Sequence, residues 1–127
     1  MNSLLDTAPF LWAVAAPGKL TAEVRGLLEG RQHAFTVSAA SLGEVIIKAE
    51  KGVLPIPDAP RWLDTALRSL EADVLPVTAS HVYRVHRLPM IHRDPFDRII
   101  LAQAVVEGWP LITSDATVRS YPVPTLW

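Results

Sequence analysis

The chain has 127 residues, half of them apolar, and a formal charge of −1. This length is typical of one domain with its own core, so we expect a single globular domain over residues 1–127. A charge so near neutrality argues against broad electrostatic binding to a polyanion, although carboxylates gathered in one pocket leave the remaining surface more basic. The absence of cysteine excludes disulfides and thiolate metal sites and suits the cytoplasm. We find no basic leader and no long apolar run, and expect neither export nor membrane insertion.

Short apolar runs alternate with longer helical patterns from one end of the chain to the other. That alternation is typical of an α/β domain built on a mainly parallel sheet. In chain order we expect a strand over 3–5, helices over 9–14 and 21–28, a strand over 34–37, helices over 38–51 and 58–72, a strand over 74–77, helices over 79–87 and 94–107, a strand over 110–112, a short helix over 116–120 and a final strand or tail over 123–126.

Several helix ends are marked by single residues. Thr21 is placed to cap the second helix, and Gly52 suits the left-handed conformation that ends the helix over 38–51. The helix over 94–107 has the clearest signals: Asp94 is placed to cap it, a proline follows at the first helical position, and Gly108 stops it.

Two aspartates follow predicted strands. Asp6 comes directly after the strand over 3–5, and Asp115 follows the strand over 110–112. The loops at the carboxyl ends of parallel strands line the ligand crevice, so both side chains are expected at the same edge of the sheet. Each aspartate is also placed to cap the helix after it, and for either one alone the sequence does not separate the two roles.

Glu44 lies in a helix whose other residues are small or apolar on nearly every side. A carboxylate in so dry a segment needs a partner, because burying it unpaired is costly. Lys48 offers the ordinary alternative, an exposed ion pair at i,i+4 spacing. An exposed pair does not explain the apolar surroundings, so we favour Glu44 as a site residue.

Asp97 lies three residues after Asp94, in a stretch that resembles a capping box with Asp in place of Glu. A carboxylate is favoured at any helix start, which is the structural alternative for Asp97. His92, Arg93 and Arg98 crowd the same place. Cations mixed with two acids at a helix start are more typical of a site than of a solvated face, so Asp94, Arg93 and Arg98 are candidate supporting residues.

Acids that converge from separate elements repel one another unless cations lie between them. Without cysteine, this favours a hard ion, Mg²⁺ or Mn²⁺, which prefers oxygen ligands. Such ions activate water and stabilise the attacking and leaving oxygens of a phosphodiester, so the implied reaction is phosphodiester hydrolysis. Thr113 is a candidate hydroxyl ligand or a cap of its turn. The four histidines show no metal-ligand spacing and are set aside, and neither a nucleophile elbow nor a glycine-rich phosphate loop is present.

Five stretches carry a resemblance to a known family. They are Leu-Leu-Asp-Thr at 4–7, Ser-Ala-Ala-Ser-Leu-Gly-Glu-Val at 38–45, His-Arg-Asp-Pro-Phe-Asp-Arg at 92–98, Ile-Thr-Ser-Asp at 112–115 and Pro-Thr-Leu-Trp at 124–127. In order and spacing they resemble the PIN-domain ribonucleases, especially the VapC-type toxins of bacterial toxin-antitoxin pairs. The resemblance covers essentially the whole chain.

The resemblance implies a three-layer α/β/α sandwich and an acidic catalytic and metal site made of Asp6, Glu44, Asp97 and Asp115. It also implies a Mg²⁺- or Mn²⁺-dependent endoribonuclease that cuts transfer or ribosomal RNA, forms a homodimer and is inhibited by a VapB-type antitoxin. Two departures are modest: many relatives carry His where this chain has Ala8, and an aromatic residue where it has Gly43. Neither removes a carboxylate, but Ala8 is expected to alter substrate contacts.

Two alternatives to this function stay open. The first is a PIN-like nuclease that acts on structured DNA or on ribosomal RNA precursors with the same metal site. The second is a non-catalytic interaction module on the same fold, which the presence of all four acids disfavours. For the assembly, the four tryptophans and the apolar run at 88–90 indicate a homodimer or an antitoxin-bound complex.

Overall fold

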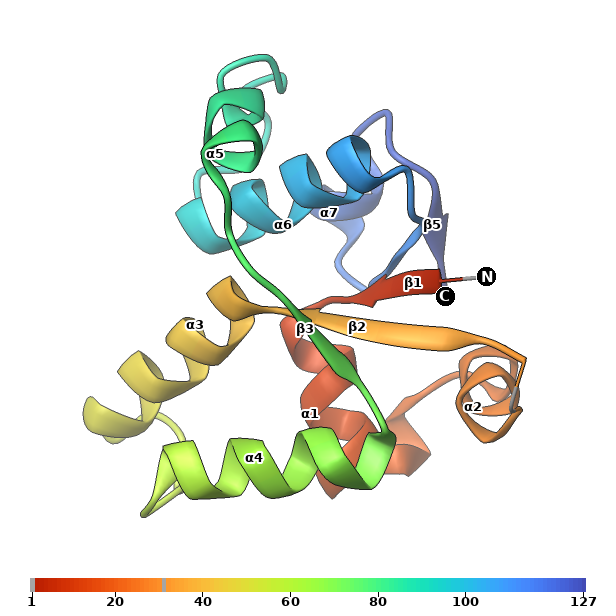
Figure 1. The fold of residues 1–127 in the computed structure, drawn as a ribbon, viewed down its shortest axis with the longest axis vertical. Helices are drawn as coiled ribbons and strands as arrows, with labels where there is room; N and C mark the ends of the chain where they lie inside the picture. The colour runs from red at the N-terminus through yellow and green to blue at the C-terminus, as the bar shows by residue number, and fades with distance from the viewer. Residues whose placement is uncertain (1, 31) are drawn as a thin grey trace.

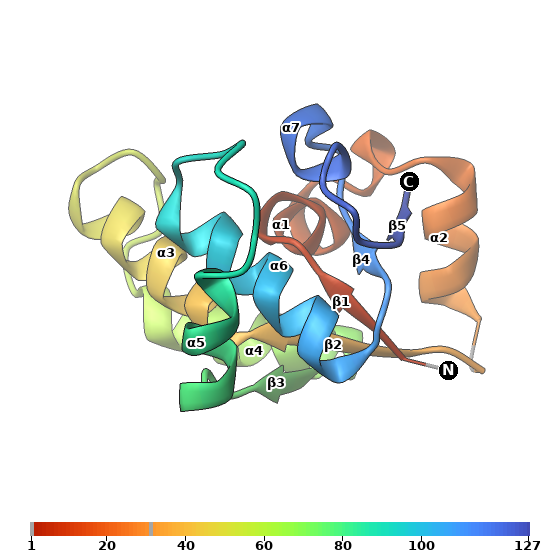
Figure 2. The same ribbon diagram turned by 90° about the horizontal axis from the view of Figure 1, so that it is seen from above.

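The structure, a computed structural model, describes residues 2–30 and 32–127. Five strands within these ranges form one sheet in the order β3-β2-β1-β4-β5, and each neighbouring pair is parallel. In Figure 2 they follow one another from the green β3 to the blue β5. Their bounds are Asn2–Leu5 for β1, Ala34–Ser38 for β2, Asp73–Leu75 for β3, Leu111–Ile112 for β4 and Thr125–Leu126 for β5. The predicted parallel sheet is confirmed.

Helices cover both faces of this sheet. They are α1 (Thr7–Ala15), α2 (Ala22–Glu29), α3 (Ala39–Glu50), α4 (Ala59–Leu70), α5 (Ala79–Val85), α6 (Pro95–Glu107) and α7 (Ala116–Arg119), with a 3-10 turn η1 at Pro17–Lys19. Figure 1 shows α1 and α4 on one side of the strands and α6 and α7 on the other, which confirms the three-layer α/β/α arrangement. No helix in the described part of the chain is both long enough and apolar enough to cross a membrane.

Two apolar cores lie on opposite faces of the sheet. Successive side chains of a strand point to opposite faces, so neighbouring leucines of β1 separate. Leu4 packs with Leu111 of β4 in the core beneath α6, whereas Leu5 packs with Ile112 in the core beneath α1 and α4. All four side chains are fully buried. Strands β1 and β4 are therefore held by packing on both faces of the sheet. This fixes the positions of the loops that follow them.

The direction of the strand order changes between β1 and β4. After β1 the chain adds β2 and then β3 on one side, and it later adds β4 and β5 on the other. In open parallel sheets a ligand crevice lies outside the carboxyl ends of the strands at such a point. Asp6 follows β1 directly, and its N–H donates to the carbonyl of Ile112 at 2.9 Å. The topology therefore brings the loops after β1 and β4 to one edge.

Several predicted boundaries were wrong by one or two residues, and two of them have a clear local cause. The strand expected over 74–77 runs from Asp73 to Leu75, because Pro76 has no N–H to continue the ladder. The helix expected over 58–72 ends at Leu70, since Glu71 adopts a left-handed conformation with φ 51°. The stop at Gly108, with φ 71°, is confirmed.

Candidate active site

A hollow of about 390 Å³ opens at this edge of the sheet, and the four predicted acids line it. The lining residues are Asp6, Thr7, Ala8, Glu44, Lys48, His92, Asp94, Asp97, Ser114 and Asp115. The acids come from separate elements: Asp6 caps α1, Glu44 lies in α3, Asp97 in the first turn of α6, and Asp115 caps α7. The convergence that the topology predicted is present in the structure.

Asp6 is held through both of its carboxylate oxygens. Its side chain is buried, with Oδ1 accepting from the N–H of Thr7 at 2.9 Å and Oδ2 accepting from the Thr113 hydroxyl at 2.8 Å. Burial raises the pKa of Asp6, and the negative charges of Glu44 and Asp115 add to this, while the two hydrogen bonds oppose it. The cap of α1 therefore uses only Oδ1 of Asp6. It fixes the direction of the Asp6 carboxylate, which still lines the pocket.

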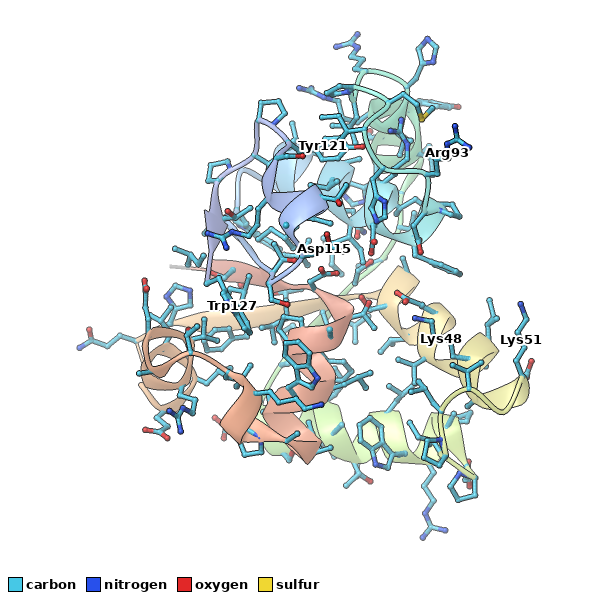
Figure 3. All side chains as sticks on the ribbon, turned by 180° about the vertical axis from the view of Figure 1, so that it is seen from behind. Lys48, Lys51, Arg93, Asp115, Tyr121 and Trp127 are labelled. Carbon is cyan, nitrogen blue, oxygen red and sulfur yellow. The ribbon has the colours of Figure 1, made fainter. Side chains whose placement is uncertain are left out.

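Glu44 has the ion pair that its spacing predicted, but the carboxylate is buried. Lys48 Nζ lies 2.6 Å from Glu44 Oε2, and the Thr7 hydroxyl donates to Oε1 at 2.9 Å. The lysine side chain is 46% exposed and the glutamate side chain 8%. The hydrogen bond to Glu44 raises the pKa of Lys48. Figure 3 shows Lys48 on the part of α3 nearer the pocket, with Lys51 farther out.

Asp97 does not cap its helix. Asp94 accepts from the N–H groups of Phe96 and Asp97 and so provides the predicted cap of α6. The Asp97 carboxylate instead lies 2.6 Å from His92 Nε2, measured at Oδ2. Burial raises the pKa of Asp97 to about 6, the negative charge of Asp6 adds to the shift, and the hydrogen bond with His92 opposes it.

Asp115 and Thr113 form the opposite wall. Asp115 is exposed, and its Oδ1 accepts from the N–H groups of Thr117 and Val118 to cap α7. The Thr113 hydroxyl accepts from the N–H of Asp115 at 3.1 Å while it donates to Asp6. Thr113 thus caps its turn and also orients the Asp6 carboxylate. From the sequence alone, a cap and a site residue are alternatives for Thr113.

The two arginines expected to support the site do not line the pocket. Arg98 is buried, and its guanidinium donates to the carbonyls of Pro89 and Val85 and to the Tyr121 hydroxyl. Arg93 is exposed and lines a different groove beside α5, away from Asp115 in Figure 3. Their nearness to the acids in sequence is no guide to where their side chains lie. Neighbours on a helix point in different directions, and here Arg98 points toward α5.

His92 is the site residue that sequence reasoning missed. One nitrogen of His92 and one carboxylate oxygen from each of Asp97 and Asp115 lie within 4.8 Å of one another. The usual search for ligand spacing within a helix does not find it, because His92 precedes the helix start by three residues. The available signal was its place immediately before the Arg-Asp-Pro-Phe-Asp stretch.

The raised pKa of Asp97 predicts how stability depends on pH when no cation is bound. In the unfolded chain Asp97 titrates near 3.8, and in the folded chain at about 6. The protonated form is therefore favoured by folding, and this contribution is complete below pH 3.8 and lost as pH rises through 6. Urea unfolding in chelator measures this effect. Between pH 4 and 7 the free energy of unfolding of Asp97→Asn should rise relative to that of wild type, by on the order of 1 to 3 kcal/mol. A pH-independent difference would contradict the shift.

Comparisons with known proteins agree with this geometry. The PIN domain family model matches residues 3–123. Ribonuclease VapC22 of Mycobacterium tuberculosis is 30% identical over 130 residues, which cover 98% of this chain and 97% of that protein. The fold is similar to the crystal structure of VapBC2 from Rickettsia felis bound to a DNA fragment from their promoter, with a TM-score of 0.74, 17% identity and coverage of 99% and 98% of the two chains. It is also similar to a toxin-antitoxin complex from Klebsiella pneumoniae, with a TM-score of 0.65, 21% identity and coverage of 98% and 96%.

Proposed function

Because this chain belongs to the PIN domain family, and within it to the VapC-type ribonucleases, we propose that it is a Mg²⁺- or Mn²⁺-dependent endoribonuclease. The observation that carries the proposal is the meeting of four carboxylates from four elements in one pocket at the carboxyl edge of the sheet. We propose that it hydrolyses transfer or ribosomal RNA in the cytoplasm, as the toxin of a pair with a VapB-type antitoxin.

The donor chemistry of the pocket fits a hard divalent ion. Its acids offer carboxylate oxygens, and burial together with neighbouring negative charge raises the pKa of both Asp6 and Asp97. A bound cation would relieve the repulsion between these negatively charged carboxylates. Asp6, Glu44, Asp97 and Asp115 would hold it, some of them through water, as is common for Mg²⁺. When bound, the ion supplies Lewis-acid chemistry: it promotes the ionisation of a water molecule and offsets negative charge on the phosphodiester.

The remaining residues of the pocket position these acids. Thr7 and Thr113 hold both oxygens of Asp6, so its carboxylate does not have to reorganise when substrate binds. Thr7 also donates to Glu44, which couples the two acids through one residue. Lys48 is half exposed beside Glu44 and carries positive charge at the rim, where a phosphate group of RNA would approach.

Removal of divalent ions is expected to abolish cleavage. After exhaustive chelation the activity on RNA should fall to background, and added Mg²⁺ or Mn²⁺ should restore it. The same ions should raise the melting temperature, because they bind the folded chain and not the unfolded one. KCl at equal ionic strength is the control and should do neither. Undiminished cleavage in chelator would overturn the metal mechanism.

The RNA substrate is identified by sequencing RNA ends after brief induction of the protein. We expect new ends at few positions, within transfer or ribosomal RNA, and no such ends when Asp97→Asn is induced to the same level. Ends spread over all transcripts would argue against a specific structured target. The absence of new RNA ends, with new ends found by sequencing DNA from the same cells, would favour the DNA-directed alternative.

We propose a homodimer or an antitoxin-bound assembly for this chain. The four tryptophans are all half-buried, so each offers less apolar surface than a fully exposed side chain would. Exposed apolar surface comes from α5 and the loop after it, where Val82 is 49% and Met90 75% exposed. Light scattering of the purified protein, alone and with the product of the neighbouring gene, should give masses above 13.9 kDa. A monomer indifferent to that product would count against the assembly.

A further inference from the structure

We propose that the imidazole of His92 is a direct ligand of the divalent ion, together with Asp97 and Asp115. This inference rests on the proposed function, since it concerns the same ion. It adds a nitrogen donor to a site that the sequence presents as made of oxygen ligands alone.

The backbone of His92 is held in place from outside the pocket. The Tyr121 hydroxyl accepts from the N–H of His92 at 2.7 Å and from that of Ile91 at 3.2 Å. Arg98 braces the same segment, because its guanidinium donates to the carbonyl of Pro89 at 3.0 Å and to the Tyr121 hydroxyl at 3.3 Å. Tyr121 and Arg98 are both buried. The loop is therefore a fixed support that presents the His92 side chain to the pocket.

The distances suit a shared coordination sphere. His92 Nε2 lies 2.6 Å from Asp97 Oδ2, and these residues and Asp115 each place one donor atom within 4.8 Å of the others. Ligand atoms about 2.1 Å from one ion lie roughly 3 Å apart when adjacent and roughly 4.2 Å apart when opposite. The contact between His92 and Asp97 is slightly shorter than the adjacent separation, and the 4.8 Å limit is slightly longer than the opposite one. Small side-chain shifts would therefore bring the three donors around one ion.

On binding the ion, His92 Nε2 exchanges its hydrogen bond with Asp97 for a bond to the metal. The imidazole coordinates in its neutral form, with the Nε2 lone pair directed at the ion. The proton that lies between Nε2 and Asp97 in the metal-free protein leaves to solvent, solvent supplies one to Nδ1 where that nitrogen lacks it, and Asp97 binds as the carboxylate. A nitrogen donor favours later first-row ions over Mg²⁺. The competing arrangement keeps the hydrogen bond, so that His92 only orients the Asp97 carboxylate. The two arrangements differ in whether a nitrogen is bonded to the ion.

Electron spin-echo envelope modulation of the Mn²⁺-loaded protein tests this difference directly. We expect modulation from a directly bound ¹⁴N in wild type and its loss in His92→Gln, a variant chosen because its amide offers Asp97 a replacement hydrogen-bond donor. The control is the same substitution at His86, an exposed residue that does not line the pocket, and it should leave the signal unchanged. Calorimetric titration should show Mn²⁺ affinity lower by roughly tenfold or more in His92→Gln, with a smaller change for Mg²⁺.

The outcomes separate this inference from the proposed function. Mn²⁺ bound to wild type without nitrogen modulation would overturn coordination by His92 and leave the metal-dependent function standing. Nitrogen modulation that persists in His92→Gln would assign the nitrogen to another residue and would also overturn it. A wild-type protein that binds no Mn²⁺ in the titration would overturn the metal dependence itself, and the role of His92 with it.

Discussion

Asp97→Asn is expected to lower the rate of RNA cleavage by roughly 100-fold or more, because a metal contributes several kcal/mol to the transition state. The substitution is nearly isosteric and removes one negative charge from the pocket. Metal-free Asp97→Asn should nevertheless be as stable as wild type at neutral pH, or more stable. The carboxylate it replaces is partly buried, beside the charge of Asp6, with its pKa raised to about 6.

The opposite pattern is expected if Asp97 only stabilises its helix start. Asn serves almost as well as Asp near a helix N-terminus, so activity would stay intact and stability would fall by a few tenths of a kcal/mol to about 1 kcal/mol. The structure already argues against this pattern, since Asp94 provides the cap and Asp97 contacts His92 instead.

Melts without metal and cleavage assays with metal, on the same preparations, measure both halves of the prediction. Asp58→Asn is the matched control, because Asp58 caps α4 through the N–H of Arg61 and does not line the pocket. That variant should lose little stability and no activity. A destabilised but fully active Asp97→Asn would return Asp97 to a structural role.

Arg98→Met is expected to lower the free energy of unfolding by about 3 to 5 kcal/mol, the largest stability effect that we predict for a polar residue. The methionine keeps most of the aliphatic volume but removes all the guanidinium donors. Three acceptors lose a partner: the carbonyls of Pro89 and Val85 and the hydroxyl of Tyr121. A hydrogen bond from a charged donor contributes about 1.5 to 3 kcal/mol net. The total stays near the low end of that range for three bonds, because each acceptor keeps another N–H donor, from Leu88, Ile91 or His92. Lysine is not expected to rescue the variant, since one ammonium cannot reproduce the planar fork.

Urea unfolding of the metal-free protein measures this effect. Arg68→Met is the control, because Arg68 pairs with Asp64 at i,i+4 on the surface, with side chains 80% and 61% exposed. Its loss should change stability by no more than about 0.5 kcal/mol. Arg98→Met should also lose cleavage activity, since Arg98 supports the loop that carries His92. If Arg98→Met were as stable as Arg68→Met, the bracing role of Arg98 would be excluded.

The elements whose signals lie within a few residues could be predicted from the sequence alone. Asp94, Pro95 and Gly108 mark the ends of α6, because capping and left-handed stops depend on neighbouring backbone groups alone. Alternating strands and helices predict a parallel sheet, and the rule for its carboxyl edge places Asp6 and Asp115 side by side. The edge strand β3 was displaced by one residue at its start, since its three residues carry little pattern of their own.

The directions of individual side chains depend on tertiary packing. Arg98 and Asp97 are neighbours in sequence, yet one braces a loop beside α5 and the other enters the pocket. Thr113 holds Asp6 across 107 positions of sequence, and Thr7 meets Glu44 across 37. Such contacts depend on strand order and on the rotation of each helix against the sheet, which packing of the two cores sets. Local propensity carries no information about either, so the place of His92 in the site could not be read from its spacing.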